Sequence, residues 1–402
     1  MFSISERILL TFESNPNKPL TVHITLRGIT WNHTRGLLPM QATAQRYHEL
    51  HPEIEIIWEK RSLQAFADES IADLSKRFDL LVIDHPSTGE AAAHGLFLPL
   101  SDHLPAEFLA DQAGNSVGKS HVSYQMDGKQ WALAIDAATP IAGWREDLLE
   151  RAGEQVPQTW EELLHLAKRG MVAFCGWPVD CLMYFYTFCI NEGETPFGPD
   201  KERVVSEEVG VRSLLSLKEL ADACDPAGFS RNPIQSWELL TLQDKVAYCP
   251  MAYGYSNYAR PGYSRKVLRF GGLVSRNGKR LTSTLGGTGL AISAQTKQRA
   301  VAVEYAQFCA SQDVQIGLFT QAGGQPGHRA AWLDPENNRQ TRHFFQDTLG
   351  TLDAAYLRAR FDHYIDFQTK APIPIVGALQ GKLAPKEALS QLNALFRSYP
   401  AR

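Results

Sequence analysis

The sequence predicts an α/β protein whose N-terminal part forms a parallel β-sheet. Apolar residues alternate with polar ones over 20–26, an apolar segment covers 54–58, and 78–83 is a continuous apolar run. Each pattern predicts a strand, and the continuous run is typical of a strand covered on both faces. A helical pattern over 63–76 separates the second strand from the third. Strands that alternate with helices favour a parallel sheet.

The rest of the chain continues this mixture of strands and helices. Thr159 and Glu162 have the spacing of a capping box, which predicts a helix that begins there. Small residues and Pro140 interrupt the apolar stretch 131–144, and such a break fits a crossing between two domains. We expect further strands at 246–249 and 290–293 and helices at 145–152, 182–190, 206–223 and 297–311.

Length and composition indicate a globular protein of two or three domains. The chain has 402 residues, of which 44% are hydrophobic and 21% are charged, so it can bury a large core. A formal net charge of -4 argues against a nucleic-acid-binding surface. No apolar run reaches the roughly 18 residues that a membrane-spanning helix needs. Residues 1–20 lack the basic and apolar segments of a secretory signal.

The six cysteines lie between positions 175 and 309, and no two of them form a Cys-x-x-Cys pair. A chain of this length needs no disulfide framework to be stable. We therefore expect mostly free thiols that pack in the core as small apolar residues. If the protein is exported, a bridge from Cys181 to Cys175 or to Cys189 is the alternative.

The most informative motif is the segment Trp31–Gly36, between the first strand and a helix for which Pro39 suits the first turn. In α/β proteins, a loop at the carboxyl end of a strand and beside the free N–H groups of a helix is a common ligand site. Trp31 offers a surface for stacking, and Arg35 offers a grip on an oxygen-rich or anionic group. The alternative is that Trp31 packs under the loop and Arg35 lies in solvent.

A second polar loop lies at the same sheet edge, because Asp84 and His85 follow the third strand. These side chains suit hydrogen bonds to hydroxyl groups or pairing with a cation. The alternative is that Asp84 caps the next helix and His85 packs beneath Pro86. A metal site of His33, His85 and Asp136 finds no support in ligand spacing, so we expect no metal.

Six short segments occur in the order found in one protein family. On these motifs the chain, over about 20–395, resembles the extracellular solute-binding proteins of ABC importers, in the group that includes maltose-binding protein. Each motif is weak alone, but six in this order are fairly specific for the family, although not for a ligand. The segments are GITWNHTRG at 28–36, FDLLVIDHP at 78–86, PQTWEEL at 157–163, YGYSNY at 253–258, LGG at 285–287 and QAGGQP at 321–326.

The resemblance implies a periplasmic-binding-protein-like fold, in which two α/β lobes surround a ligand cleft and a hinge of several crossings joins them. One lobe would comprise 1–137 and 287–332, and the other 138–286 and 333–402. Gly286 and Gly287 would be hinge points that also let backbone N–H groups approach a ligand. The partners would be a small molecule and the permease subunits of an ABC transporter, with a monomeric receptor and no cofactor. The family is periplasmic or on the cell surface, while the lack of a visible signal leaves a cytoplasmic location open.

The cleft of such a fold adds candidate ligand contacts. His33 belongs to the loop that faces the cleft in the family, and Arg61 follows the second strand at the same edge. Asp136 and Thr139 lie at the inferred crossing, where side chains of both lobes converge. Their alternative role is a hydrogen bond within the hinge.

Aromatic and amide side chains complete the candidate site. Trp177 and Asp180 combine stacking with hydroxyl binding, and their alternative roles are a core tryptophan and a helix cap. Tyr253 and Tyr255 each offer apolar area and one hydroxyl at a small cost in entropy, which suits a cleft that closes. The remaining candidates are Asn257 in the same motif and Gln325 in a glycine-rich loop.

No catalytic motif stands out, because nucleophile-elbow, phosphate-loop and His-Glu-x-x-His patterns are missing from the sequence. We therefore predict a solute-binding receptor of an ABC transporter that closes its lobes on a small polar solute. Aromatic and carboxylate side chains favour a sugar or polyol, whereas Arg35 and Arg61 favour a sugar-derived acid. The alternative is a cytosolic enzyme or ligand sensor on the same scaffold that uses Asp84, His85 or Asp136.

Overall fold

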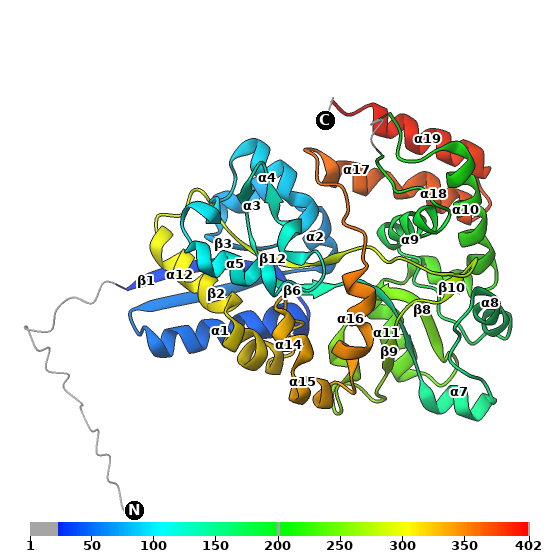
Figure 1. Ribbon diagram of the computed structural model, residues 1–402, viewed down its shortest axis with the longest axis horizontal. Helices are drawn as coiled ribbons and strands as arrows, with labels where there is room; N and C mark the ends of the chain where they lie inside the picture. Colours follow the sequence, from blue (N-terminus) through cyan, green and yellow to red (C-terminus); the bar gives the residue numbers. More distant parts are fainter. Residues whose placement is uncertain (1–22, 199–201, 401–402) are drawn as a thin grey trace, which may run out of the picture.

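The computed structural model describes residues 23–198 and 202–400, which form two α/β lobes (Figure 1). The first lobe is built on a five-stranded sheet with the order β2-β1-β3-β12-β6, and the second on a three-stranded sheet with the order β8-β7-β9. The first sheet contains β1 (Ile24–Trp31), β2 (Ile54–Arg61), β3 (Leu80–Asp84), β6 (Leu133–Ala138) and β12 (Gly286–Ile292). The second contains β7 (Pro140–Trp144), β8 (Tyr248–Tyr253) and β9 (Arg269–Gly271).

The predicted parallel sheet is confirmed for its first three strands. Strand β1 pairs in parallel with β2 on one side and with β3 on the other. Strand β12 arrives from much later in the chain and runs antiparallel between β3 and β6. Two small ladders stand apart from these sheets, β4 (Gln125–Met126) with β5 (Lys129–Gln130) and β10 (Ser275–Arg276) with β11 (Lys279–Arg280).

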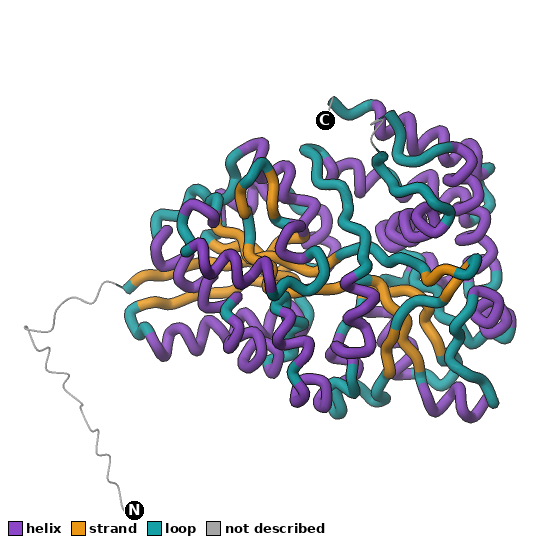
Figure 2. Tube along the Cα trace, viewed as in Figure 1, coloured by secondary structure: helices purple, strands orange, loops and turns teal. Residues whose placement is uncertain are grey.

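Helices surround both sheets, so that the strands lie inside each lobe (Figure 2). The first lobe carries α1 (Thr34–Leu50), α2 (Leu63–Asp68), α3 (Ile71–Arg77), α4 (Thr88–His94), α5 (Ala106–Gly114), α6 (Ser120–Ser123) and α12 (Arg299–Ala310). The second carries α7 (Glu146–Ala152), α8 (Trp160–Lys168), α9 (Pro178–Asn191), α10 (Glu207–Asp222) and α11 (Pro233–Leu242). After α13 (Gln312–Val314) follow α14 (Arg329–Leu333), α15 (Pro335–Gln340), α16 (Phe344–Asp353), α17 (Tyr364–Lys370), α18 (Pro372–Leu379) and α19 (Pro385–Arg397).

Local capping chemistry moves some boundaries away from the sequence prediction. Helix α1 begins at Thr34 because the His33 side chain caps it, with Nδ1 accepting from the Arg35 N–H at 3.0 Å. Pro39 therefore lies inside this helix and not in its first turn. The helix predicted over 63–76 is two helices, because a second serine cap interrupts it at Ser70. The first part of the strand predicted at 20–26 lies outside the described residues.

Apolar packing explains why β3 is an unbroken apolar run. Leu80 and Val82 belong to one core cluster of the first lobe, and Leu81 and Ile83 belong to the cluster on the other face of the sheet. The prediction that this strand is covered on both faces is therefore confirmed. The second lobe has a larger core of its own, to which α8, α9 and α16–α19 all contribute side chains.

The predicted helix start at Thr159 is confirmed, because both hydrogen bonds of the capping box with Glu162 are present. All six cysteines are free and buried. No helix within 23–198 or 202–400 has the length and apolar character needed to cross a membrane.

The chain passes between the two sheets at Thr139, the one residue between β6 and β7. Its hydroxyl donates to the Thr284 carbonyl at 2.7 Å, which ties this crossing to the segment before β12. The segment after α16 joins them, since the Tyr356 N–H donates to the Ser283 carbonyl at 2.8 Å. The sequence analysis did not locate this third segment of the connection between the lobes. The exact lobe boundaries given above stay a prediction.

Gly287 has a φ of +96°, and a Cβ there would lie 2.4 Å from the Asp136 carbonyl oxygen. We expect Gly287→Ala to lower the free energy of unfolding by about 1–3 kcal/mol, because both the strained φ and the clash must be absorbed. Urea unfolding measures the change. Gly350→Ala is the control, since it lies in α16 with open space around it, and it should be neutral or stabilising by up to about 1 kcal/mol. Equal effects of the two substitutions would contradict this account.

Candidate ligand-binding cleft

A cavity of about 380 Å³ lies between the lobes and is lined from both of them. Strands β1, β3 and β12 reach it from the first lobe, and the N-terminal ends of α9 and α11 with the end of β8 reach it from the second. The structure brings many of the sequence candidates together here. They are Trp31, Arg35, Asp84, Trp177, Asp180, Tyr253, Tyr255, Gly286 and Gly287.

Trp31 is the last residue of β1, and its ring packs between the cavity and the start of α1. Gly36 makes this possible, because a Cβ there would come within 2.3 Å of the indole. The indole Nε1 is buried and has no hydrogen-bond partner among the residues that the structure describes. The ring centroid lies 5.3 Å from that of Phe66, a further cavity residue on α2. Trp31 thus lines the cavity with an apolar ring and holds a buried indole N–H for which the described residues provide no acceptor.

The Arg35 guanidinium joins the two lobes at the cavity floor. Its Nε donates to Asp136 Oδ2 at 2.8 Å, and its Nη2 donates to Asp136 Oδ1. Its Nη1 donates to the Gly254 carbonyl at 2.8 Å, and its Cζ lies 4.8 Å from the centre of the Tyr255 ring. Burial lowers the pKa of Arg35, but the Asp136 carboxylate outweighs this and raises it overall. Arg35 is therefore permanently charged and already neutralised.

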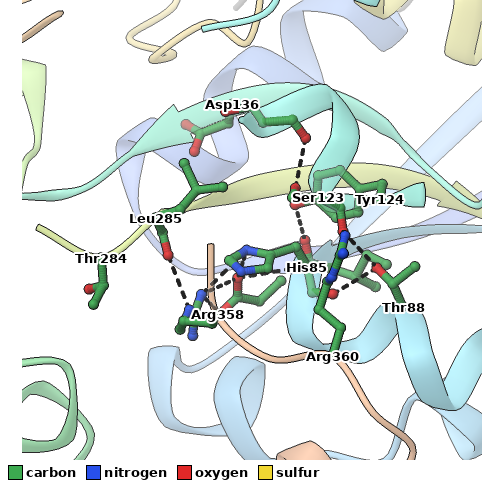
Figure 3. A network of polar contacts seen from close by, with 12 residues as sticks. His85, Thr88, Ser123, Tyr124, Asp136, Thr284, Leu285, Arg358 and Arg360 are labelled. Atoms are coloured by element: carbon green, nitrogen blue, oxygen red, sulfur yellow. Dashed lines mark hydrogen bonds and ion pairs between the residues drawn. The ribbon is translucent and has the colours of Figure 1, made fainter. Parts of the chain in front are cut away.

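A second ion pair lies at the other wall, where Arg358 meets Asp84. Figure 3 shows the Arg358 side chain between Leu285 and His85. One guanidinium nitrogen, Nη2, donates to both carboxylate oxygens at 2.7 and 2.8 Å. The other nitrogens donate to the Leu285 carbonyl and to Gln368 Oε1. Burial raises the pKa of Asp84, but Arg358 together with His85 outweighs it and lowers the pKa overall. Like Arg35, Arg358 has its charge balanced by a protein carboxylate.

The second lobe contributes Trp177 and Asp180 from the first turn of α9. Trp177 is the N-cap residue and lines the cavity with its side chain, while Asp180 is almost completely buried. Asp180 Oδ2 has no hydrogen-bond partner, and burial raises the pKa of this carboxyl to about 8. Tyr253, at the end of β8, packs against Gly286, where a Cβ would lie 2.4 Å from its ring.

Other candidates lie behind the cavity wall, and the structure does not bring them to the lining. His85 is completely buried behind Asp84, and Asp136 faces Arg35. Arg61 donates to the Ala65 and Val82 carbonyls and lies over the Phe66 ring, so it supports α2. Thr139 makes the hinge hydrogen bond described above. None of these four side chains lines the cavity.

His33, Asn257 and Gln325 instead connect one lobe to the other. His33 Nε2 lies 3.2 Å from the Tyr263 hydroxyl, and its ring packs edge-on against Tyr255. Burial, with a smaller effect of Arg35, lowers the pKa of His33 to about 3, so this ring is neutral. Asn257 Nδ2 donates to the Gly323 carbonyl, and Gln325 Oε1 accepts from the Ser256 N–H. These are contacts between lobes and not contacts with the cavity.

Several lining residues escaped the sequence analysis. Leu63, Gln64 and Phe66 reach the cavity from α2, and Asn232 with Gln235 reach it from the capping box of α11. The capping-box spacing was a usable signal, whereas Arg358 and Gln368 lie in C-terminal segments without a recognisable motif. A second cavity of about 610 Å³ adjoins the first and shares its lining at Gln64, Trp177, Val179 and Gln368. The rest of its wall comes mainly from α18.

No group of three His, Cys, Asp or Glu side chains suited to a metal ion occurs in the described part of the chain. The polar atoms of the cavity are instead two neutralised ion pairs, one unpaired carboxyl and uncommitted donors on aromatic and hydroxyl groups. Thr288 Oγ1 is one further buried polar atom without a partner. Such a lining can hold an uncharged polar molecule by hydrogen bonds and stacking.

Comparison with known proteins decides the family. The bacterial extracellular solute-binding protein family matches residues 42–338. The chain belongs to this family. Solved structures of similar fold include maltose-bound MalE3 of T. maritima, with a TM-score of 0.78 at 19% identity, covering 93% of this chain and 99% of that one.

Two further solved structures of this solute-binding fold come from ABC transporters. One is a solute-binding protein of Agrobacterium radiobacter in complex with ribitol, with a TM-score of 0.78 at 18% identity, covering 93% of this chain and 98% of that one. The other is from Thermotoga lettingae with α-D-tagatose bound, with a TM-score of 0.79 at 17% identity, covering 93% and 100%. At these identities the likeness establishes the fold, and the two-lobe architecture predicted from the sequence is confirmed.

Breaking the Arg35 ion pair tests its role in joining the lobes. We expect Arg35→Met to lower the free energy of unfolding by about 3–5 kcal/mol, because it leaves a buried carboxyl and a buried carbonyl without their partner. Arg46→Met on the same helix is the control, since its side chain is half exposed and forms a surface ion pair with Glu49. The control should cost less than about 1 kcal/mol in urea unfolding. Similar losses in both variants would contradict the assignment.

Asp180 should make stability depend on pH. Its folded-state pKa of about 8 exceeds its ordinary value, so the folded protein keeps a proton that the unfolded chain releases. This contribution is complete below about pH 4 and is lost as the pH rises to about 8. We expect the stability of Asp180→Asn to depend less on pH. The unfolding free energy of the variant minus that of wild type should therefore rise by about 1–3 kcal/mol from about pH 5 to 8.5. Parallel pH profiles of the two proteins would refute the effect.

Proposed function

We propose that this protein is the solute receptor of an ABC importer and that it closes its two lobes on a small polar solute, a sugar, polyol or sugar-derived acid. The observation that carries the proposal is the cavity itself, which is lined by aromatic and hydrogen-bonding side chains from both lobes. Its volume of about 380 Å³ fits one small molecule. Proteins of the same fold hold maltose, ribitol and α-D-tagatose.

The rings of Trp31, Trp177, Tyr253 and Tyr255 supply the stacking surfaces in this proposal. Aromatic rings bury a large apolar area with little loss of side-chain entropy, and they match the apolar C–H faces of a sugar. The free indole N–H of Trp31 and the hydroxyl of Thr288 supply hydrogen bonds to solute hydroxyl groups. A solute that satisfies these buried groups replaces the water that an open cleft would offer them.

Closure follows from the placement of these groups on different lobes. A solute that touches Trp31 and Trp177 at once binds the closed arrangement better than an open one, and this difference in affinity shifts the population toward closure. The contacts that His33, Asn257 and Gln325 make between the lobes also stabilise the closed arrangement. The solute supplies the rest of the free energy that closure needs.

Within the proposed range of solutes, the ion pairs argue against a sugar-derived acid and for a sugar or polyol without an acidic group. Arg35 and Arg358 each donate hydrogen bonds from Nε, Nη1 and Nη2 to protein acceptors. A ligand carboxylate would have to compete with Asp136 or Asp84 for a guanidinium that is already neutralised. The sequence-based expectation of an anion grip at Arg35 and Arg61 therefore loses its main support.

The alternative of an enzyme or sensor that uses Asp84, His85 or Asp136 draws no specific support from the site. An acid–base catalyst works best with a pKa near the working pH. Burial, followed by the charge of Arg358, lowers the pKa of His85 to about 4, and Asp84 stays ionised. The receptor proposal also includes permease subunits as partners, a monomeric state and a periplasmic or cell-surface location.

A thermal-shift screen of sugars, polyols and sugar acids tests the proposal, followed by calorimetry on each hit. We expect at least one solute to raise the melting temperature and Trp177→Ala to weaken its binding about tenfold or more. Leu333→Ala, at a position 59% exposed and away from the cavity, is the control and should bind as wild type does. If none of these solutes changes the melting temperature, the receptor proposal fails. Chemically unchanged recovery of the bound solute separates a receptor from an enzyme.

A further inference from the structure

The cavity lining contains one carboxyl group, that of Asp180, for which the described residues provide no counter-ion. Among the charged side chains of its lining, Arg35 pairs with Asp136 and Arg358 pairs with Asp84. Asp180 has no ion pair within residues 23–198 and 202–400; its carboxyl interacts with the Cys175 thiol, and its Oδ2 atom is buried without a hydrogen-bond partner. Because both arginines are paired with carboxylates, the net charge of this lining changes when Asp180 ionises, and it then becomes negative.

In the described part of the chain, the titratable groups that interact with Asp180 are themselves uncharged at neutral pH. Cys175 precedes α9, Cys181 and Tyr184 lie on α9, and Cys249 lies on β8. Burial raises the pKa of each of these thiols and of the Tyr184 phenol. At the end of β8 and just after it, burial also raises the pKa of Tyr253 and that of Tyr255, the latter to about 12. The described neighbours therefore provide no counter-ion for an ionised Asp180.

We propose that Asp180 is the counter-ion for a protonated amine, so that the solute is an amino-substituted polyol or sugar. The inference rests on the proposed receptor function and narrows its ligand class. An ammonium group in contact with the Asp180 carboxylate would supply the missing charge and a charge-assisted hydrogen bond in one step. A hydroxyl group in the same place would supply only a neutral hydrogen bond.

The aromatic lining supports the same ligand class. Trp31, Trp177 and Tyr253 line the cavity that Asp180 also lines. The faces of such rings attract a cation, most strongly where water is excluded, while they still stack on the carbon skeleton of a polyol. A buried carboxylate together with aromatic rings is thus a better match to an ammonium group than to a neutral solute or an anion.

Binding of such a solute would release a proton. In the empty cavity the pKa of about 8 keeps Asp180 mainly protonated at neutral pH. An ammonium group enters already charged, because an alkyl amine has a pKa near 10, and its charge stabilises the carboxylate. The carboxyl proton then leaves to solvent and is taken up by the buffer, so that one proton is released for each amine bound. A neutral polyol leaves Asp180 protonated and releases nothing.

The experiment compares glucamine with glucitol, which differ only by an ammonium group in place of one hydroxyl, together with glucosamine and glucose. Calorimetry at about pH 7 in two buffers of different ionisation enthalpy gives both affinity and proton release. We expect the amine of a pair to bind about 10- to 100-fold more tightly than its neutral partner. We also expect release of close to one proton per bound glucamine, which has the basicity of an alkyl amine, and of none with the neutral solutes.

Asp180→Asn keeps the shape of the side chain and removes the charge, so it should abolish both the preference for the amine and the proton release. Asp222→Asn, an exposed position at the end of α10, is the matched control and should change neither. If the neutral partner binds at least as tightly, or if Asp180→Asn keeps the amine preference, this inference is overturned while the receptor proposal stands. If no solute of either kind binds and the wider screen is also empty, both fail.

Discussion

The contact on which the cleft depends is the hydrogen-bonded guanidinium of Arg35. It holds Asp136 of the first lobe and the Gly254 carbonyl of the second, and all three groups are buried. Because a polar group without a partner is costly in such a place, each lobe completes the hydrogen bonds of the other. The same contact sets how the lobes face one another and removes a positive charge from the cavity.

The pairing of Arg358 with Asp84 repeats this arrangement at the opposite wall. Two balanced ion pairs therefore frame a cavity whose remaining character comes from aromatic rings and from Asp180. Selection among solutes then depends on ring stacking and on a single carboxyl group. The electrostatics of the site are simple because most of its charges have been neutralised within the protein.

Sequence reasoning located the parts of the site that follow from strand order. Trp31 and Asp84 end neighbouring parallel strands, so their meeting at one sheet edge was predictable from local patterns. Partnership over long separations was not, since Asp136 lies 101 positions from Arg35 and Arg358 lies 274 positions from Asp84. His33 illustrates the same limit, because a histidine in a polar loop gave no local sign that it would cap a helix and contact Tyr263.

The distribution of the buried thiols has a practical consequence for following motion in this molecule. Cys309 packs in the core around the five-stranded sheet, whereas the other five cysteines pack in the core of the second lobe. A thiol reagent reaches a buried sulfur only when the surrounding structure opens. The labelling rate of Cys309 would therefore report local unfolding of the first lobe, and the labelling rates of the other five cysteines would report local unfolding of the second.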